Sequence, residues 1–200
     1  MSEPTRREAL TAAALVGVNS GLTANARQKT AIATENDKPG STDWQLTYVK
    51  FDAKAKYRQS LIEGYCTRTS VAAGDKLGLC VSTEPASAFS IDIYRLGYYG
   101  GTGGRLVKQL GPFDGKPQPT PEVGAKRLRE CQWEPAVTLE IPKDWVSGVY
   151  LAKLSAAKHR YQSYCTFIVR DDRKADVLSF EGFRLATVPC PASTPAKCLL

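Results

Sequence analysis

The chain has 200 residues, which is enough for one domain with tails or for two small domains, and 42% of them are hydrophobic. No apolar run reaches the roughly 18 residues of a transmembrane helix, so no membrane span is expected. The net charge of +7 is dispersed, without a basic helix or a nucleic-acid-binding motif. We therefore expect no nucleic-acid partner and at most a weak attraction to anionic polymers.

Residues 1–26 have the order of features of a twin-arginine-type signal peptide. Arg6 and Arg7 precede a weakly apolar run, and Ala24 and Ala26 place small residues at the two cleavage-site positions. The pattern predicts export to the periplasm or the cell exterior. A cytosolic amphipathic helix is the alternative.

Two segments separate this signal from the expected domain. Residues 27–43 are polar, lack aromatic side chains and run into Pro39 and Gly40, which predicts a disordered linker. Residues 44–60 begin with an alternating run from Trp44 and are expected to form a strand or an extended arm, with a charged helix or turn over 52–59.

Residues 61–178 read as a β-domain, because short alternating runs follow one another without intervening helical patterns. This arrangement predicts an antiparallel sandwich of two sheets. Tyr150, just after Gly148, fits a tyrosine corner, and residues 179–200 are predicted to be an irregular tail. The expected strands are 61–71 (broken near 67–69), 76–83, 89–96, 105–113, 127–133, 136–142, 148–154 and 161–170.

A glycine-rich segment, residues 97–104, follows the 89–96 strand and has five glycines and two tyrosines. Such a run predicts a tight, exposed loop. It lacks the Gly-Lys-Ser/Thr ending of a phosphate-binding loop and opens no helix. We expect it to be a docking loop, formed by Tyr98, Tyr99, Gly100, Gly101 and Arg105.

The six cysteines contain no C-x-x-C pair, which argues against a zinc site or a thioredoxin-type motif. In an exported chain an even number suggests disulfides. Cys66 and Cys165, on the first and last sandwich strands, are the candidate pair. The alternative is that the cysteines are buried free thiols. By strand parity, Cys80 should point away from the core.

The sequence offers no catalytic set. His159 is the only histidine and lies in a charged hairpin tip, and the adjacent Asp171 and Asp172 would point to opposite faces of a strand. We therefore predict no catalytic residue and no metal site. Trp133 and Trp145 are either packing residues or exposed aromatic side chains.

Four blocks give the chain a family resemblance: IDIYRLGYYGGTGGRLV from Ile91, ECQWEP from Glu130, DWVSGVYLAKL from Asp144 and FIVRDDRKADVL from Phe167. In this order they resemble the segment before the catalytic domain in relatives of the large (beta) subunit of N,N-dimethylformamidase. The resemblance covers residues 61–178.

The resemblance implies an immunoglobulin-like β-sandwich in a parent that hydrolyses amides. It places the iron and its ligands in a downstream catalytic domain, which would be the partner of this sandwich. Because the residues after 178 depart from the family, we expect a member truncated before that domain. Two hypotheses follow: a non-catalytic accessory domain, or a free-standing exported binding module for polysaccharide or protein.

Overall fold

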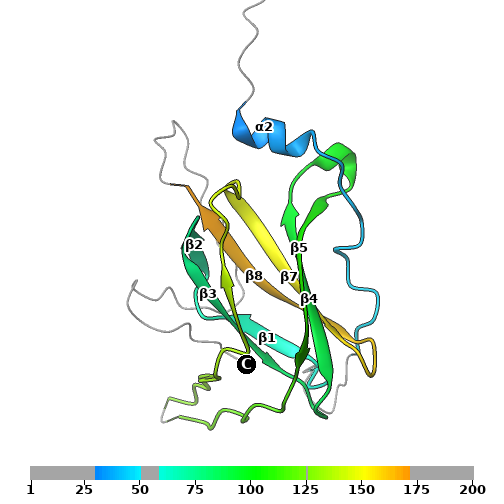
Figure 1. Cartoon of the computed structure of the whole chain (residues 1–200). Coiled ribbons are helices and arrows are strands. Elements are labelled where there is room, and N and C mark those ends of the chain that lie inside the picture. The colour runs from blue at the N-terminus through cyan, green and yellow to red at the C-terminus, as the bar shows by residue number, and fades with distance from the viewer. Residues whose placement is uncertain (1–29, 51–58, 125, 172–200) are drawn as a thin grey trace, which may run out of the picture.

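The strands of the protein form two sheets that pack face to face (Figure 1). The computed structural model describes residues 30–50, 59–124 and 126–171. The predicted all-β sandwich is confirmed. The three-stranded sheet has the order β1 (Glu63–Cys66), β3 (Lys76–Ser82), β6 (Val137–Glu140). The five-stranded sheet has the order β2 (Ser70–Ala72), β8 (Gln162–Arg170), β7 (Gly148–Ala156), β4 (Ala88–Leu96), β5 (Gly104–Asp114).

The core lies between the sheets and follows the alternation of the sequence. Phe89, Ile91 and Ile93 of β4 are at most 1% exposed, and they meet the likewise buried Leu77 and Leu79 of β3. Burying such a side chain contributes about 1.5–3 kcal/mol. This shared core fixes which face of β4 points outward, and so it positions the loop that follows the strand.

The tyrosine corner is present at the start of β7. The Tyr150 hydroxyl donates a hydrogen bond to the Val146 carbonyl at 2.7 Å. Its ring stacks on Trp145, with centroids 4.8 Å apart, and on Phe167 at 5.5 Å. Trp145 is therefore a packing residue.

The expected first strand divides between the two sheets. After β1 the chain turns at Thr67, whose amide donates to the Gly78 carbonyl at 2.9 Å, and β2 then pairs in parallel with β8. The break expected near 67–69 is thus the crossing from one sheet to the other.

The prediction of a strand over residues 127–133 is wrong. This segment is irregular and covers the outer face of the three-stranded sheet, where Cys131 and Trp133 bury Cys80. Cys80 points away from the central core, as its parity predicted, but it is fully buried beneath this second cluster. The apolar residues of 127–133 predict a strand because a segment that covers a sheet and a strand that belongs to one need similar side chains.

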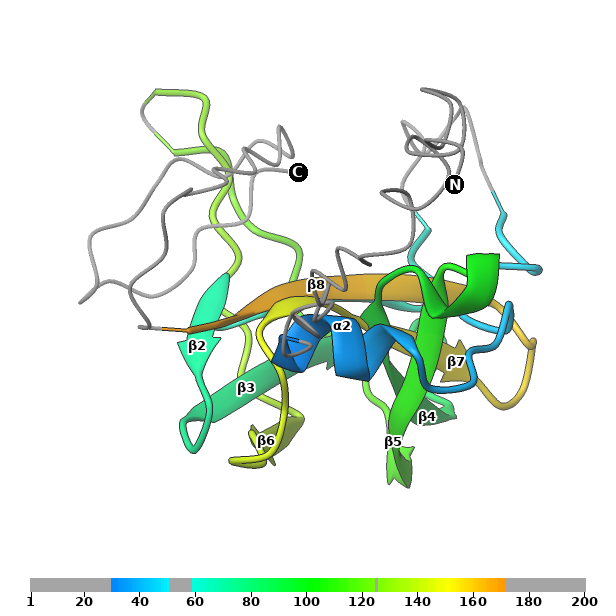
Figure 2. The ribbon, with the colours of Figure 1, turned by 90° about the horizontal axis from the view of Figure 1, so that it is seen from above.

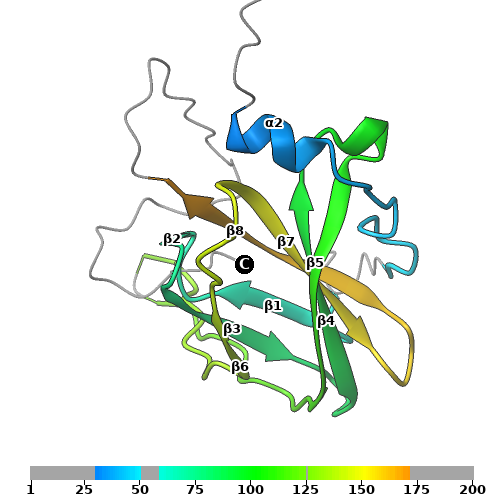
Figure 3. The same ribbon diagram turned by 45° about the horizontal axis from the view of Figure 1, so that its top comes forward.

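The prediction of a disordered linker over 27–43 is wrong for its described part. Helix α2 (Ala31–Asn36) forms there, and the Thr30 side chain accepts the Ala33 amide at 3.2 Å as its N-cap. Figure 3 shows α2 lying across the end of the sandwich, near the ends of β7 and β5.

After α2 the chain follows the outer face of the five-stranded sheet. Residues 44–50 form an extended arm without becoming a strand. We call residues 30–50 the N-terminal strap. The expected signal peptide (1–26), most of the 52–59 segment and the tail (179–200) lie outside the described residues.

Candidate docking site

The glycine-rich loop is a closed turn between β4 and β5, as the sequence predicted. It contains the short 3-10 helix η2 (Tyr99–Gly101). Gly100 and Gly101 have φ values of 66° and 94°, which favour glycine. The Gly97 amide donates to the Gly103 carbonyl at 3.1 Å and closes the turn. Seen end-on in Figure 2, η2 and α2 lie at the same end of the sandwich.

The two tyrosines of the loop have opposite environments. Tyr98 is 71% exposed, whereas Tyr99 is 2% exposed. The expectation that both are presented on the surface is therefore wrong for Tyr99. Its ring turns inward, its hydroxyl donates to Glu35 at 3.1 Å, and the same hydroxyl accepts a hydrogen bond from Arg95 at 2.9 Å.

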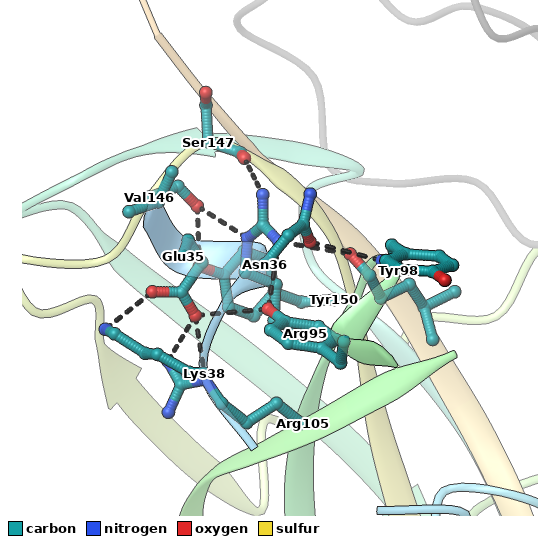
Figure 4. A network of polar contacts seen from close by, with 11 residues as sticks. Glu35, Asn36, Lys38, Arg95, Tyr98, Arg105, Val146, Ser147 and Tyr150 are labelled. Carbon is teal, nitrogen blue, oxygen red and sulfur yellow. Dashed lines mark hydrogen bonds and ion pairs between the residues drawn. The ribbon is translucent and has the colours of Figure 1, made fainter. Parts of the chain in front are cut away.

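Glu35 of α2 is the centre of this polar network (Figure 4). It is 3% exposed and accepts hydrogen bonds from Arg105 Nε at 2.8 Å and from Lys38 Nζ at 2.7 Å. Burial by itself would raise the pKa of the Glu35 carboxyl. The Lys38 and Arg105 hydrogen bonds and the Arg105 charge outweigh burial, so this pKa lies below its ordinary value. The carboxylate is ionised and fully engaged.

Arg95, a buried residue of β4, joins this network to the tyrosine corner. Its guanidinium donates to the Ser147 carbonyl at 2.8 Å and, more weakly, to the Val146 carbonyl at 3.4 Å. The Val146 carbonyl also accepts the Tyr150 hydroxyl. The loop, the corner and α2 are thus held as one unit.

The strap also fixes the loop from its outer side. The Asn36 side chain accepts the Tyr98 amide at 3.2 Å, and Trp44 Nε1 donates to the Thr102 carbonyl at 2.9 Å. Lys153 of β7 donates to the Asp43 carbonyl at 2.6 Å. Of the expected docking residues, the structure brings Tyr99 and Arg105 into this network and leaves Tyr98, Gly100 and Gly101 at the surface.

Sequence reasoning missed Glu35, Trp44, Arg95 and Lys153 as residues of this site. Arg95 and Lys153 did carry a signal, because each interrupts an apolar strand pattern and so requires a polar partner. Glu35 carried no such signal, since the residues around it show no extended apolar pattern.

Residues 90–181 match the family model described as N,N-dimethylformamidase beta subunit-like, C-terminal. This part of the chain is similar to that family. It includes the glycine loop, the tyrosine corner and both arginines of the network. The matched family model describes the C-terminal part of the proteins in that family. That this segment precedes a catalytic domain stays a prediction. No curated protein and no solved structure matches significantly.

Within the dimethylformamidase-like segment, Cys165 is a free thiol, as is Cys66. The structure brings the two candidate residues together as buried thiols across the core, and the disulfide between them stays a prediction beside the alternative of buried thiols. They lie on β8 and β1, which belong to different sheets, and not on neighbouring edges of one. A hydrogen bond with Cys66, together with burial, raises the pKa of the Cys165 thiol well above its ordinary value.

The chemistry available at the dimethylformamidase-like loop is recognition. Its one exposed aromatic group, Tyr98, stands on a backbone fixed from several sides, while its charged groups are engaged with one another. In the described ranges no three His, Cys, Asp or Glu side chains lie close enough together to hold a metal ion. In the same ranges no helix is long and apolar enough to cross a membrane. Arg6, Arg7, Ala24 and Ala26 lie outside the described residues.

Proposed function

We propose that this sandwich is a non-catalytic accessory domain of an exported, N,N-dimethylformamidase-like amide hydrolase, and that its glycine loop docks the catalytic domain. The observation that carries the proposal is the contrast within the loop: Tyr98 is 71% exposed, yet the turn beneath it is held by buried contacts. The family match over residues 90–181 supports the amide-hydrolase context.

A fixed exposed tyrosine is suited to be a docking residue. Binding orders little that is not already ordered, because the strap and the loop hydrogen bonds hold the Tyr98 backbone. A tyrosine also supplies a large apolar surface together with a polar hydroxyl, and such residues dominate interface energies. Glu35 is unsuited to be a general base, because its lowered pKa and its full set of donors keep its carboxylate engaged.

The test is to mix the purified chain with the separately produced catalytic domain of a family relative. Hydrogen exchange over residues 98–104 should slow on mixing, and Tyr98→Ala should weaken the complex at least about tenfold. The control is Tyr48→Ala, which removes another exposed tyrosine, remote from the loop along the strap. The chain alone should not hydrolyse formamides, with or without added iron, because the proposal assigns iron and catalysis to the other domain.

Three outcomes would contradict this proposal. They are unchanged exchange in the loop, equal effects of the two tyrosine variants, and amide turnover by the chain alone.

A free-standing exported binding module for polysaccharide or protein is the second candidate. The exposure of Tyr98 favours it as well, since an exposed ring also stacks on sugars. Retention of the chain on an immobilised polysaccharide, lost in Tyr98→Ala, together with no binding of the catalytic domain, would select this alternative.

A further inference from the structure

A second concave surface lies at the other end of the five-stranded sheet from the glycine loop. It is a cleft of about 490 Å³ on the outer face, between the strap and the start of β4. This volume is in the range of small-ligand sites. The residues that matter here are Thr47, Tyr48, Ser90, Ser155, Arg160 and Gln162.

The floor of the cleft is a row of hydrogen-bond donors across three strands. Ser90 of β4 pairs with Ser155 of β7, and Ser155 pairs with Gln162 of β8. The Gln162 side-chain oxygen accepts from the Thr47 amide at 2.8 Å and from its hydroxyl at 3.2 Å. That contact leaves the Gln162 amide nitrogen as a donor. Within the described residues, neither the Ser90 nor the Ser155 hydroxyl has a hydrogen-bond partner.

Arg160 supplies the charge of the cleft. Its guanidinium lies 5.4 Å from the centroid of the Tyr48 ring, and Tyr48 is 48% exposed. Arg160 makes no ion pair with any described residue, and it is the one charged residue among the described residues that line the cleft. Its φ of 60° is uncommon for a side-chain-bearing residue, and such backbone strain clusters at functional sites.

The acidic residue next along the outer face of β4 is already engaged. Asp92 accepts a hydrogen bond from Gln109 at 3.0 Å and pairs across the sheet with Lys153. As far as the described residues go, the cleft therefore combines a guanidinium without an ion pair, three uncharged donor groups and an aromatic wall.

We propose that this cleft binds a small organic carboxylate with a flat apolar portion. The carboxylate would accept hydrogen bonds from Arg160 and from the floor donors, with the planar guanidinium suited to bidentate contact. The flat portion would pack beside Tyr48. This site is separate from the Tyr98 loop and does not rest on the accessory role.

The experiment uses benzoate as the probe and monitors the amide resonances of the purified chain by NMR. Benzoate should give saturable shifts at residues around Ser90, Ser155 and Arg160. Benzamide should bind at least about tenfold more weakly, because it lacks the charge that strengthens hydrogen bonds to a guanidinium, and benzylammonium should not bind. Benzoate and benzamide should shift the same resonances, since these two probes share one ring.

Two variants test residues of the cleft, and a third serves as the control. Arg160→Gln should weaken benzoate at least about tenfold, whereas Lys143→Gln, which removes the same charge from an exposed position that does not line the cleft, should leave binding unchanged. Ser155→Ala keeps the Arg160 backbone untouched and should weaken benzoate several-fold. The proposal is overturned if benzoate shows no saturable binding at millimolar concentration, if benzylammonium binds equally well, or if folded Arg160→Gln and Ser155→Ala both bind like the wild type.

Discussion

Glu35 shows how a single residue can decide the path of a whole segment. It accepts hydrogen bonds from Lys38 and Arg105, and through the Tyr99 hydroxyl it reaches Arg95 near the end of β4. Without it, Arg105 and Tyr99 would lose their shared acceptor. The attachment of α2 therefore depends on a charge that lies in a stretch with no apolar pattern.

Removing the Glu35 charge should change the stability of the protein in a way that depends on pH. Glu35→Gln should destabilise the protein by about 2 kcal/mol near neutral pH, because Arg105 and Lys38 keep their charges and lose the carboxylate. The folded pKa of Glu35 is lowered, so the folded protein binds fewer protons there than the unfolded chain does. Its stabilisation is complete above the ordinary value of 4.5 and is lost as the pH falls through the lower folded value.

Urea unfolding at several pH values, compared between wild type and variant, measures this difference. The gap should narrow below pH 4.5 and close at lower pH. Glu134→Gln is the control, since its 3.5 Å pair with Lys116 is exposed and should matter little at any pH. A gap between wild type and Glu35→Gln that stays constant down to acid pH would contradict the role assigned to the Glu35 charge.

At the scale of elements, the strap covers the outer face of the five-stranded sheet through separate side-chain contacts, not through a continuous strand pairing. Trp44 is its main apolar anchor, because the ring packs directly on the loop backbone: a Cβ added at Gly104 would lie 2.6 Å from Trp44 Cδ1. The Tyr164 hydroxyl donates to the Trp44 carbonyl. Lys153 Nζ donates to the carbonyls of the two flanking residues, Asp43 and Gln45. Backbone hydrogen bonds from side chains thus replace the ladder of a regular strand.

Trp44→Ala should therefore release the strap while leaving the sandwich folded. We expect a loss of about 2 kcal/mol, less than for a fully buried tryptophan because Trp44 is only half-buried. Hydrogen exchange should accelerate at residues 31–48 and 98–104 and stay unchanged in β3 and β7. Ile32→Ala, at an exposed apolar position of α2, is the matched control. Uniform acceleration across both sheets would show that the strap is part of the global folding unit.

The elements also show what sequence reasoning can reach. β4 and β8 were predictable because buried core residues alternate with less buried ones over most of their length, which imposes a period of two on the residues. β3 and β7 keep that apolar alternation on their core face, although their outer faces are largely buried as well. The 127–133 segment and Tyr99 were not predictable, because both are buried by parts of the chain that are distant in sequence. The unequal fates of Tyr98 and Tyr99 depend on α2, and the polar sequence around α2 gave no sign of a helix that docks on the loop.

For the whole molecule, the position of the strap bears on the expected export signal. Cleavage after Ala26 would remove Arg6 and Arg7 with two glutamates, leaving 25 basic and 18 acidic residues and the same net charge of +7. The mature chain would then begin at Arg27, three residues before Thr30, the N-cap of α2. The predicted processing site and the strap are thus adjacent but do not overlap.

Export by the twin-arginine route is consistent with this arrangement, because that route accepts folded cargo and the strap would be in place before processing. Replacing both Arg6 and Arg7 by Lys should abolish transport of the chain, and of a folded reporter fused after residue 29, from the cytoplasm of a bacterial host. Arg27→Lys makes the same chemical change just beyond the predicted cleavage site and should leave export intact. Cell fractionation with mass determination of the exported species measures both the transport and the new N-terminus. Unchanged export of the double variant, or a mature N-terminus inside α2, would contradict the predicted signal.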